Sequence, residues 1–390
     1  MNDIDQTLLD KHPHLRLVFG EGVVAQVGEL AREFGGEKVL LVTDPGIVAA
    51  GHADAVRGHL EAAGLGVSLF DQSKENPTSA CIDDCSRAAR EAGVNFIIGL
   101  GGGSSMDTAK GANFILTNGG TMKDYWGVGK ASQPMLPSLM IPTTAGTGSE
   151  CQSFALISDN DTHQKMACGD PKAMAKAALL DPALTVSQPT RVTACTGVDA
   201  VAHAVETAVT RKRNEASLKY SREAFRLFMG SLSRALQNPG DLEARGRMLL
   251  GAALAGTAIE HSMLGAAHSA ANPLTAHFDV IHGQAVGMML PHVIRFNAVD
   301  EAAAAGYADL IVDTPVAPTN GAASAEALAH EIETSLDTAG LPRALADCGV
   351  QEAMLDTLSE EAAQQWTASF NPRDITAADF VALYQKAFTS

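Results

Sequence analysis

The pattern of apolar and polar positions differs between the two halves of the chain. The first half alternates short apolar runs with amphipathic stretches of helical period. Strands are predicted at 38–43, 66–70 and 95–100, with weaker candidates at 139–142 and 177–180. Helices are predicted between them, at 23–34, 53–63, 79–92 and 107–116. This alternation is typical of a largely parallel β-sheet with flanking helices.

The pattern changes near residues 181–189, which read DPALTVSQP. Beyond this segment β-branched runs nearly disappear, and alanine- and leucine-rich helical patterns replace them. Ser324 and Thr376 are the predicted N-caps of two of these helices. The predicted helices are 192–210, 215–237, 242–267, 324–339 and 376–388. The sequence therefore predicts an α/β domain over residues 1–188 and an all-helical domain over residues 189–390.

Composition and charge narrow the possible partners. The 390 residues can form two domains, and the formal charge of −17 argues against nucleic acid and against anionic membrane surfaces. Backbone N–H groups can still bind phosphate locally. No apolar run approaches the roughly 20 residues that span a bilayer. The opening MNDIDQTLLDKHPHL also lacks the basic and apolar segments of a signal peptide. We therefore expect a cytoplasmic protein with no nucleic-acid or membrane partner.

A glycine- and serine-rich stretch follows the third predicted strand. It reads LGGGSSMDTAK over residues 100–110, and a helix is predicted to begin at Met106 or Asp107. Glycines let backbone N–H groups approach a phosphate, and the start of a helix adds partial positive charge. The stretch matches neither GxGxxG nor the P-loop, so a tight strand-to-helix turn capped by serines is the alternative.

Two further segments at strand ends favour a nucleotide. Asp44 directly follows the first predicted strand, where a carboxylate can accept hydrogen bonds from an adenosine ribose and repel a 2′-phosphate. A helix N-cap or turn aspartate before Pro45 is the alternative. Residues 142–150, PTTAGTGSE, combine two glycines with four hydroxyl side chains after an apolar strand. This composition favours a ligand-facing loop, and a plain surface loop is its alternative.

Acidic and imidazole side chains accumulate in the helical half. Asp199 and His203 are four residues apart in TGVDAVAHAVE, so they share one face of an apolar helix. His268, His277 and His282 follow within one short segment. Such groups, when buried, need each other or a metal. One aspartate with two or three histidines suits Fe(II), Zn(II), Mn(II) or Ni(II). A buried Asp–His pair and chance proximity of His277 are the alternatives.

Six sequence segments, distributed along nearly the whole chain, occur in a characteristic order. They are ENPT at 75–78, GGGSSMDTAK at 101–110, PTTAGTGSE at 142–150, TGVDAVAHAVE at 196–206, the segment with His268 and His282, and NPR at 371–373. Together they resemble the iron-containing (group III) alcohol dehydrogenase family. The resemblance implies a dehydroquinate synthase-like architecture, with an N-terminal dinucleotide-binding domain, a C-terminal helical domain that binds the metal, and a cleft between them.

The resemblance also assigns residues to the two cofactors. It places the metal ligands at Asp199, His203, His268 and His282. It places the pyrophosphate loop of NAD at Gly102, Gly103 and Ser104, with Asp107 at the following helix start. Asp44 falls where members of the family select NAD over NADP. The remaining cofactor-binding positions are Thr143, Thr144, Thr147, Lys165 and Leu184.

One position departs from the family. Many members have a histidine four residues after the third metal ligand, assigned to substrate contact or proton relay, and here that position is Asn272. An asparagine can hydrogen-bond but cannot carry a proton near neutral pH. His277 is the candidate replacement, so Asn272 and His277 are the predicted catalytic residues.

The activity implied by the resemblance is hydride transfer between NAD and a short primary alcohol, a diol or the corresponding aldehyde. Iron, or one of the other three metals, would act as Lewis acid. The alternatives are a sister oxidoreductase (maleylacetate reductase, glycerol dehydrogenase or hydroxyacid–oxoacid transhydrogenase), a carbon–oxygen lyase of the dehydroquinate-synthase type, and a non-catalytic NAD-binding protein. A homo-oligomer, dimer or larger, is also implied. Pocket positions fall on Phe154, Ile259 and Thr367.

Overall fold

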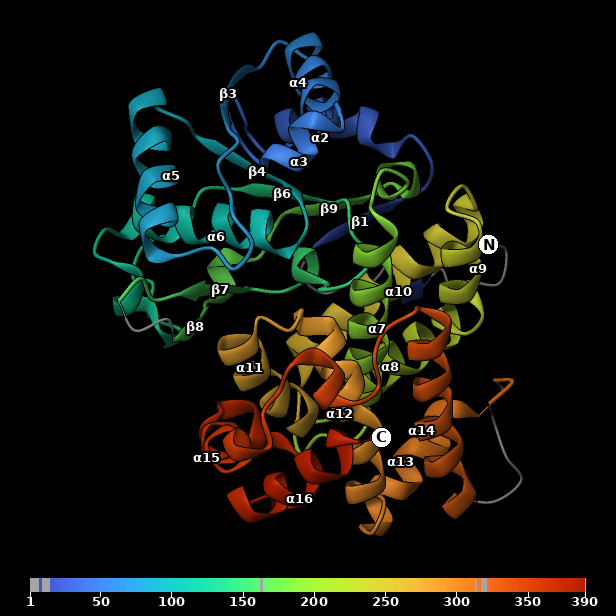
Figure 1. Cartoon of the computed structure of the whole chain (residues 1–390). Helices are drawn as coiled ribbons and strands as arrows, with labels where there is room; N and C mark the ends of the chain where they lie inside the picture. The colour runs from blue at the N-terminus through green and yellow to red at the C-terminus, as the bar shows by residue number, and fades with distance from the viewer. Residues whose placement is uncertain (1–6, 9–14, 162–163, 313, 317–320, 390) are drawn as a thin grey trace. The chain divides into compact units, whose positions relative to one another are not determined.

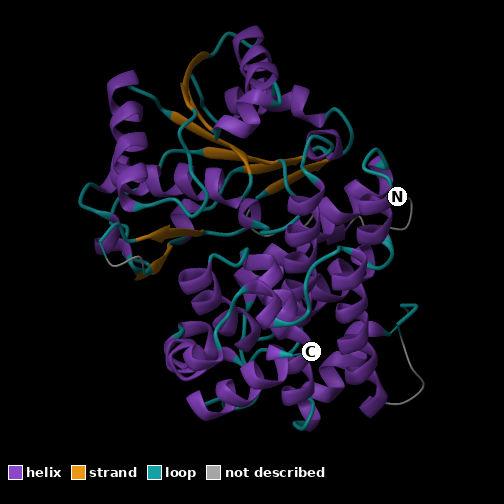
Figure 2. Ribbon diagram, in the orientation of Figure 1, coloured by secondary structure: helices purple, strands orange, loops and turns teal. Residues whose placement is uncertain are grey.

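The computed structural model describes residues 7–8, 15–161, 164–312, 314–316 and 321–389. It divides into two compact units. The first unit comprises residues 1–144 and 148–188, and the second comprises residues 145–147 and 189–390. All strands of the described chain belong to the first unit, and its second unit is built from helices (Figure 2).

A six-stranded sheet forms the centre of the first unit (Figure 1). The strand order is β1-β9-β6-β4-β2-β3, and every neighbouring pair is parallel. The five predicted strands are confirmed to within one residue at each end, whereas β1 was not predicted. The bounds are β1 (Arg16–Phe19), β2 (Lys38–Val42), β3 (Gly66–Phe70), β4 (Phe96–Gly101), β6 (Ser138–Pro142) and β9 (Ala177–Leu180).

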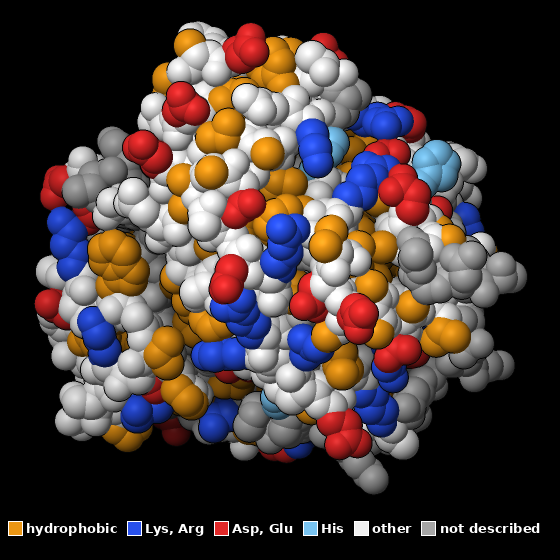
Figure 3. All heavy atoms as spheres, turned by 90° about the horizontal axis from the view of Figure 1, so that it is seen from below, with side chains coloured by type: hydrophobic (Ala, Val, Ile, Leu, Met, Phe, Trp, Pro, Cys, Tyr) orange, Lys and Arg blue, Asp and Glu red, His pale blue; other side chains and the backbone are white. Residues whose placement is uncertain are grey.

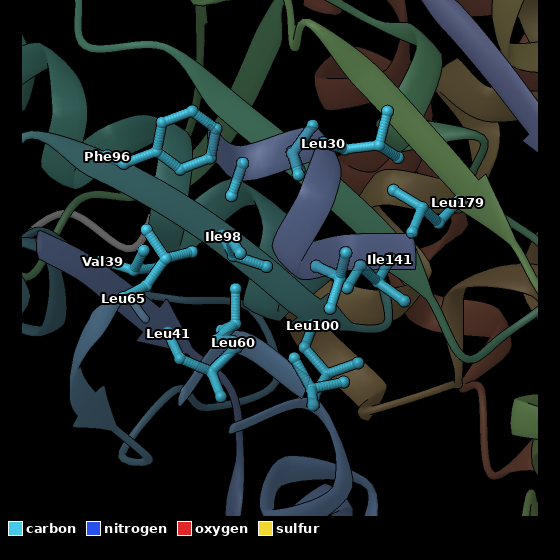
Figure 4. Close-up of a cluster of buried hydrophobic side chains, with 14 of the residues drawn as sticks. Leu30, Val39, Leu41, Leu60, Leu65, Phe96, Ile98, Leu100, Ile141 and Leu179 are labelled. Atoms are coloured by element: carbon cyan, nitrogen blue, oxygen red, sulfur yellow. The ribbon is translucent and has the colours of Figure 1, made fainter. Parts of the chain in front are cut away.

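Helices cover both faces of this sheet, so its strands are apolar at successive positions rather than at alternate ones. In β2, Val39 and Leu41 point to one face and Leu40 and Val42 to the other. Figure 4 shows the first of these cores, in which the strands pack against α2 and α4. The helices of the unit are η1 (Val23–Gln26), α2 (Val27–Glu33), α3 (Pro45–Ala49), α4 (His52–Ala62), α5 (Ser79–Ala92) and α6 (Gly103–Asn118).

The start of α6 differs from the prediction. The helix begins at Gly103, with Gly102 as its N-cap, and not at Met106 or Asp107. Glycine is a poor helix former, so the sequence of the first turn gives no helical signal. The consequence is that the GGGSS stretch contains the first turn of the helix.

A second, three-stranded sheet was not predicted. Its order is β5-β8-β7, with β5 and β8 parallel and β7 and β8 antiparallel. The elements of this part of the chain are η2 (Met122–Tyr125), β5 (Gly127–Val128), η3 (Ser149–Cys151), β7 (Phe154–Ser158), β8 (Lys165–Gly169), η4 (Pro171–Ala173) and η5 (Pro182–Thr185). β5 has only two residues and gives no period, and β8 (KMACG) includes a lysine and a glycine, which are depleted in strands.

The second unit agrees with the prediction of an all-helical half, but two long helices are divided. The pattern over 215–237 breaks at Gly230, which has left-handed backbone conformation, and the pattern over 242–267 breaks after His261. The helices are α7 (Thr190–Thr207), α8 (Glu215–Phe228), α9 (Ser231–Gln237), α10 (Leu242–His261), α11 (Ala266–Phe278), α12 (His282–Asn297), α13 (Glu301–Ile311), α14 (Gly321–Thr338), η6 (Leu345–Cys348), η7 (Glu352–Met354), α15 (Leu355–Gln364), η8 (Trp366–Phe370) and α16 (Ala377–Phe388).

The two predicted N-caps have different outcomes. Thr376 caps α16 in a capping box with Asp379, as predicted. Ser324 lies inside α14, which begins at Gly321, so that prediction is wrong. A serine near a helix start is ambiguous by one turn when the preceding residues are glycine and alanine.

The surface carries both charge signs. On the face shown in Figure 3, Lys and Arg side chains are interspersed with Asp and Glu side chains. Several of the arginines form ion pairs, such as Arg295 with Glu326 and Arg222 with Asp309. Among the described residues, none of the helices combines the length and apolar character that a bilayer crossing requires.

Candidate functional site

Three neighbouring strands of the first unit end beside one another. In the order β6-β4-β2, Thr143 and Gly102 directly follow the first two strands, and Asp44 lies two residues after the end of β2. Ser105 Oγ donates to Asp44 Oδ2 at 2.9 Å, which joins the ends of β4 and β2. The Thr143 N–H donates to the Gly101 carbonyl at 3.0 Å, which joins the ends of β6 and β4. The predicted segments therefore meet at the carboxyl edge of the sheet.

This edge contains the point where the direction of the chain reverses. After β2 the chain continues to β3 on one side, and after β4 it continues to β6 on the other. Ligands of open α/β sheets bind at such switch points, outside the carboxyl ends of the strands. The start of α6 lies at this point and presents backbone N–H groups whose helix partners are absent in the first turn. The arrangement suits an anionic group.

A glycine is required at position 101 because the backbone there lies close to the side chains of Ser105 and Asp44. Its φ of +142° is rarely adopted by residues with a side chain. A Cβ at Gly101 would lie 2.7 Å from Ser105 Oγ and 3.1 Å from Asp44 Oδ2. A larger residue would therefore separate β4 from Asp44.

Asp44 has a structural role at this edge. Its Oδ1 accepts hydrogen bonds from the N–H groups of Gly46 and Ile47, at 2.9 and 3.1 Å, so it caps α3. This is the alternative that the sequence left open, and it coexists with a ligand role because each carboxylate oxygen has two lone pairs. The partly exposed Asp44 can accept further donors through Oδ2.

Asp107 lies inside the first unit, in what we call the interior lysine cluster: Asp107, Lys110 and Ser149. Lys110 Nζ donates to Ser149 O, Ser149 Oγ and Phe154 O at 2.6–2.9 Å. Asp107 accepts from Ser149 Oγ at 2.7 Å and from the Leu156 N–H at 3.1 Å. Burial raises the pKa of Asp107, although Lys110 opposes the rise. Both oxygens of Asp107 thus have protein partners.

The other predicted cofactor positions are dispersed. Thr144 lies beside Gly102, whereas Leu184 is buried in the core of the first unit. Lys165 begins β8, in the second sheet, and its Nζ donates to Asn76 at 3.3 Å. Thr147 belongs to the short segment assigned to the second unit. Thr143 and Thr144 lie next to the start of α6 within the first unit.

Glu150 is a buried carboxyl group that the sequence did not single out. Only 1% of the residue is exposed, and its Oε1 has no hydrogen-bond partner. Burial raises its pKa from 4.5 to about 7. It follows Ser149 directly in η3, so it adjoins the interior lysine cluster.

The second unit brings together acidic and imidazole groups from three helices, which we call the metal cluster: Asp199, His203, His268 and His282. Asp199 and His203 lie on α7, His268 on α11 and His282 at the start of α12. Ligand atoms of Asp199, His268 and His282 lie within 4.8 Å of one another. His203 Nε2 lies 3.6 Å from Asp199 Oδ2, and the His203 ring stacks on that of His268 at 4.9 Å.

Gly283 permits the third helix to approach. A Cβ there would lie 2.1 Å from the Cys195 carbonyl oxygen and 3.0 Å from Asp199 Cβ. Because α12 begins at His282, this contact places the imidazole beside α7. The sequence shows that His282 precedes Gly283, but it does not show that Gly283 packs closely against α7.

The metal cluster is incompletely hydrogen-bonded. Asp199 Oδ1, His203 Nδ1 and His268 Nε2 are buried and have no hydrogen-bond partner. Burial would raise the pKa of Asp199, but the imidazoles of His203, His268 and His282 hold it below its ordinary value. Burial lowers the pKa of His203. Buried polar atoms without partners are costly, so a cation among these N and O atoms fits the donor set.

Glu206 completes the surroundings of His268. Its Oε2 accepts from His268 Nδ1 at 2.5 Å and from the Gly265 N–H at 3.1 Å, and its Oε1 accepts from the Ala267 N–H at 2.7 Å. Burial lowers the pKa of His268, but Glu206 and Asp199 raise it to about 9. Sequence reasoning missed this residue, although Asp199, His203 and Glu206 share a face at the spacing i, i+4, i+7.

The predicted catalytic pair lies further along α11. Asn272 donates to Gln365 Oε1 at 3.0 Å. His277 Nε2 contacts the carboxylate of Glu361 at 2.9 Å, and both side chains are partly exposed. His277 is not among the groups whose ligand atoms converge with those of Asp199.

Comparisons with known proteins identify the family. The family model "Iron-containing alcohol dehydrogenase" matches residues 13–182, and "Fe-containing alcohol dehydrogenase family, C-terminal" matches residues 193–388. The NAD-dependent methanol dehydrogenase of Bacillus methanolicus is 31% identical over 370 residues, which cover 95% of this chain and 97% of the relative. The 1,3-propanediol dehydrogenase of Klebsiella pneumoniae is 32% identical over 373 residues, covering 95% and 96%.

A solved structure agrees with these matches along nearly the whole chain. That of a 1,3-propanediol oxidoreductase superposes with a TM-score of 0.92 at 30% identity and covers 96% of this chain and 98% of its own. The two family models, the relatives and this structure confirm the resemblance carried by the six sequence segments. The chain belongs to the iron-containing alcohol dehydrogenase family and is an oxidoreductase of that family.

Proposed function

We propose that the protein transfers a hydride from a short primary alcohol or diol to NAD⁺, and in the reverse direction from NADH to the corresponding aldehyde. The observation that carries the proposal is the convergence of partnerless buried atoms in the metal cluster. Asp199 Oδ1 and His268 Nε2 lie 3.4 Å apart, and neither has a hydrogen-bond partner. A protein that used these groups only for packing would leave their hydrogen-bonding capacity unused, at a cost in stability.

In this proposal Asp199, His203, His268 and His282 hold the metal ion. When bound, the ion supplies a Lewis acid that lowers the pKa of the alcohol hydroxyl or polarises the aldehyde carbonyl. Asp199 contributes the negative charge that partly neutralises the ion. The histidines supply neutral nitrogen ligands, a mixture that suits Fe(II) and also Zn(II), Mn(II) or Ni(II).

The first unit would bind NAD at the carboxyl edge of its sheet. The N–H groups at Gly103 and Ser104 would hold the pyrophosphate, where the helix dipole favours negative charge. Asp44 would accept hydrogen bonds from the ribose hydroxyls. We therefore propose the division predicted from the sequence, with residues 1–188 binding the dinucleotide and residues 189–390 binding the metal and carrying the chemistry.

The proposed proton route involves two residues of α11, Asn272 and His277. Asn272 replaces the histidine of many relatives and is bonded to Gln365, so it would orient groups and not carry a proton. We retain His277 as the proton carrier, with Glu361 holding its Nε2. Replacement of His277 by alanine should then change both kcat and the pH–rate profile. If neither changes, His277 has no part in the reaction.

The substrate class rests on the relatives. Methanol and 1,3-propanediol appear in the names of two relatives that align along nearly their whole length. Both are small and uncharged, in agreement with apolar pocket positions such as Ile259. The predictions of a cytoplasmic location, from the sequence, and of a homodimer or larger oligomer, from the family resemblance, belong to the same proposal.

The test is metal content measured together with turnover on a panel of short alcohols and aldehydes. Turnover is followed by NADH absorbance before and after chelation, with anaerobic return of Fe(II), Zn(II) or Mn(II). Activity lost with the metal and restored by one ion supports the proposal and names the ion. Activity that persists after chelation favours a metal-independent reductase of the same scaffold.

A further inference from the structure

We propose that Glu206 is a positioning residue that fixes the tautomer and the orientation of His268 as a metal ligand. The inference rests on the proposed function, because it concerns the metal that the metal cluster would hold. Glu206 touches neither the substrate nor the reacting atoms in this proposal, and acts through His268 alone. The family resemblance assigns it no role.

The first step of the argument is the hydrogen on His268. A carboxylate oxygen accepts hydrogen bonds, so the Nδ1 that lies 2.5 Å from Glu206 Oε2 must carry the hydrogen. The ring then presents an unprotonated Nε2 when it is neutral. Nε2 is the atom that lies 3.4 Å from Asp199 Oδ1 and has no hydrogen-bond partner. The contact with Glu206 thus selects the tautomer that a metal requires.

The second step is the rigidity of Glu206 itself. Besides His268, its carboxylate accepts the N–H groups of Gly265 and Ala267, at the start of α11. The side chain is buried, with 3% of the residue exposed. Both oxygens are therefore held by groups of the same helix turn that carries His268. This fixes the imidazole relative to α7, which supplies Asp199 and His203.

The third step is the charge of the acceptor. Three donors converge on Glu206, and an amide in its place could accept through only one of its two terminal atoms. Glu206→Gln would therefore turn an NH₂ group toward a backbone N–H or toward His268. A negative acceptor also makes the imidazole a more basic ligand. Changes in such partners of metal-binding histidines typically lower metal affinity about 10–100-fold.

The experiment titrates metal-free wild-type protein, Glu206→Gln and Thr207→Val with Co(II). The affinity comes from competition with a chelator, and the visible absorption spectrum reports the ligand geometry. Thr207 is the matched control: it is the next residue of α7, is fully buried, and bonds Ser221 Oγ and the His203 carbonyl but not His268. Its replacement should lower the melting temperature and leave the Co(II) affinity unchanged.

The inference is supported if Glu206→Gln lowers the Co(II) affinity about 10–100-fold and shifts the spectrum, while Thr207→Val does neither. It is overturned if Glu206→Gln keeps the wild-type affinity and spectrum, or if Thr207→Val loses as much affinity. If Glu206→Gln does not fold, Glu206→Asp withdraws the carboxylate by one methylene and is held to the same criteria. A wild-type protein that binds no Co(II) overturns the proposed function and this inference together, whereas binding with an unaffected variant overturns the inference alone.

Discussion

The interior lysine cluster and the metal cluster are both buried and charged, but they differ in how their polar atoms are satisfied. In the first, Lys110 Nζ has three oxygen partners, and both oxygens of Asp107 accept hydrogen bonds. In the second, Asp199 Oδ1 and His268 Nε2 have no hydrogen-bond partner. Asp107, Lys110, Asp199 and His268 are all buried, so burial alone does not distinguish a structural group from a ligand site.

The difference teaches which cluster can bind something. A network whose donors and acceptors already have protein partners gains little from a ligand, and it contributes to stability. An unsatisfied one lowers stability until a ligand completes it, which proteins tolerate at functional sites. Asp107 therefore acts as part of the scaffold in this structure, although the family resemblance placed it beside the cofactor. Its role toward NAD remains a prediction.

The largest effect is expected from breaking the metal cluster. Asp199→Ala or His268→Ala should abolish stoichiometric metal binding and lower kcat/KM by roughly 10³-fold or more, since a Lewis acid supplies several kcal/mol of transition-state stabilisation. Metal analysis of the purified variants and NADH-linked assays measure both quantities. Asp170→Asn is the control, because Asp170 is fully buried but has protein partners in the first unit. Variants that retain metal and activity would contradict the ligand assignment.

The next effect concerns the satisfied cluster. Lys110→Met should destabilise the protein by about 3–5 kcal/mol, because it leaves Asp107 as an uncompensated buried charge and removes one donor from the carbonyls of Ser149 and Phe154. Denaturant unfolding measures the change. Lys172→Met is the matched control: Lys172 also contacts an aspartate and a carbonyl, but its side chain is 42% exposed, so the loss should stay below about 1 kcal/mol. Equal losses would mean that the interior lysine cluster is not a stabilising network.

Glu150 gives a pH-dependent test, since it is the unsatisfied neighbour of the interior lysine cluster. Burial raises its pKa from 4.5 to about 7, so between these values the folded protein holds a proton that the unfolded chain releases. Stability should therefore fall as pH rises through this window, and the full cost, on the order of 3 kcal/mol, remains above it. Glu150→Gln removes this dependence. Its unfolding free energy should rise relative to wild type between about pH 5 and pH 8.

The test for Glu150 compares how the unfolding free energy changes with pH in wild type and in Glu150→Gln. Any constant offset from burying an amide shifts the variant equally at all pH values, so only the difference in slope matters. Parallel curves for wild type and Glu150→Gln would show that the carboxyl group ionises freely in the folded protein.

Much of the fold could be predicted because its strands are buried on both faces. Continuous apolar runs such as KVLLV mark β2 without reference to the rest of the chain. The second sheet was missed since strands such as β5, with two residues, give no period. The start of α6 at Gly103 was missed for a different reason: the helix is held there by the strand end and not by the propensity of its glycines.

The candidate site could be predicted only in part. Asp199 and His203 share a helix face, which spacing alone reveals. The approach of His268 and His282 depends on how α11 and α12 pack, so it came from the family resemblance and not from periodicity. Glu206 shows the limit best: its i+7 position was visible, but its partner His268 lies on another helix, and only the fold brings the two together.

The smallest expected effect separates the two roles of Asp44. Asp44→Ser keeps a side chain that can cap α3 but removes the charge that would repel a 2′-phosphate. The ratio of kcat/KM for NADP to that for NAD should rise about tenfold, which corresponds to about 1.4 kcal/mol. Ser105→Ala is the control, because it removes the bond to Asp44 Oδ2 and leaves the charge in place, so the ratio should not change. If Asp44→Ser also leaves the ratio unchanged, Asp44 only caps α3, and the carboxyl edge of the sheet selects its cofactor by other groups.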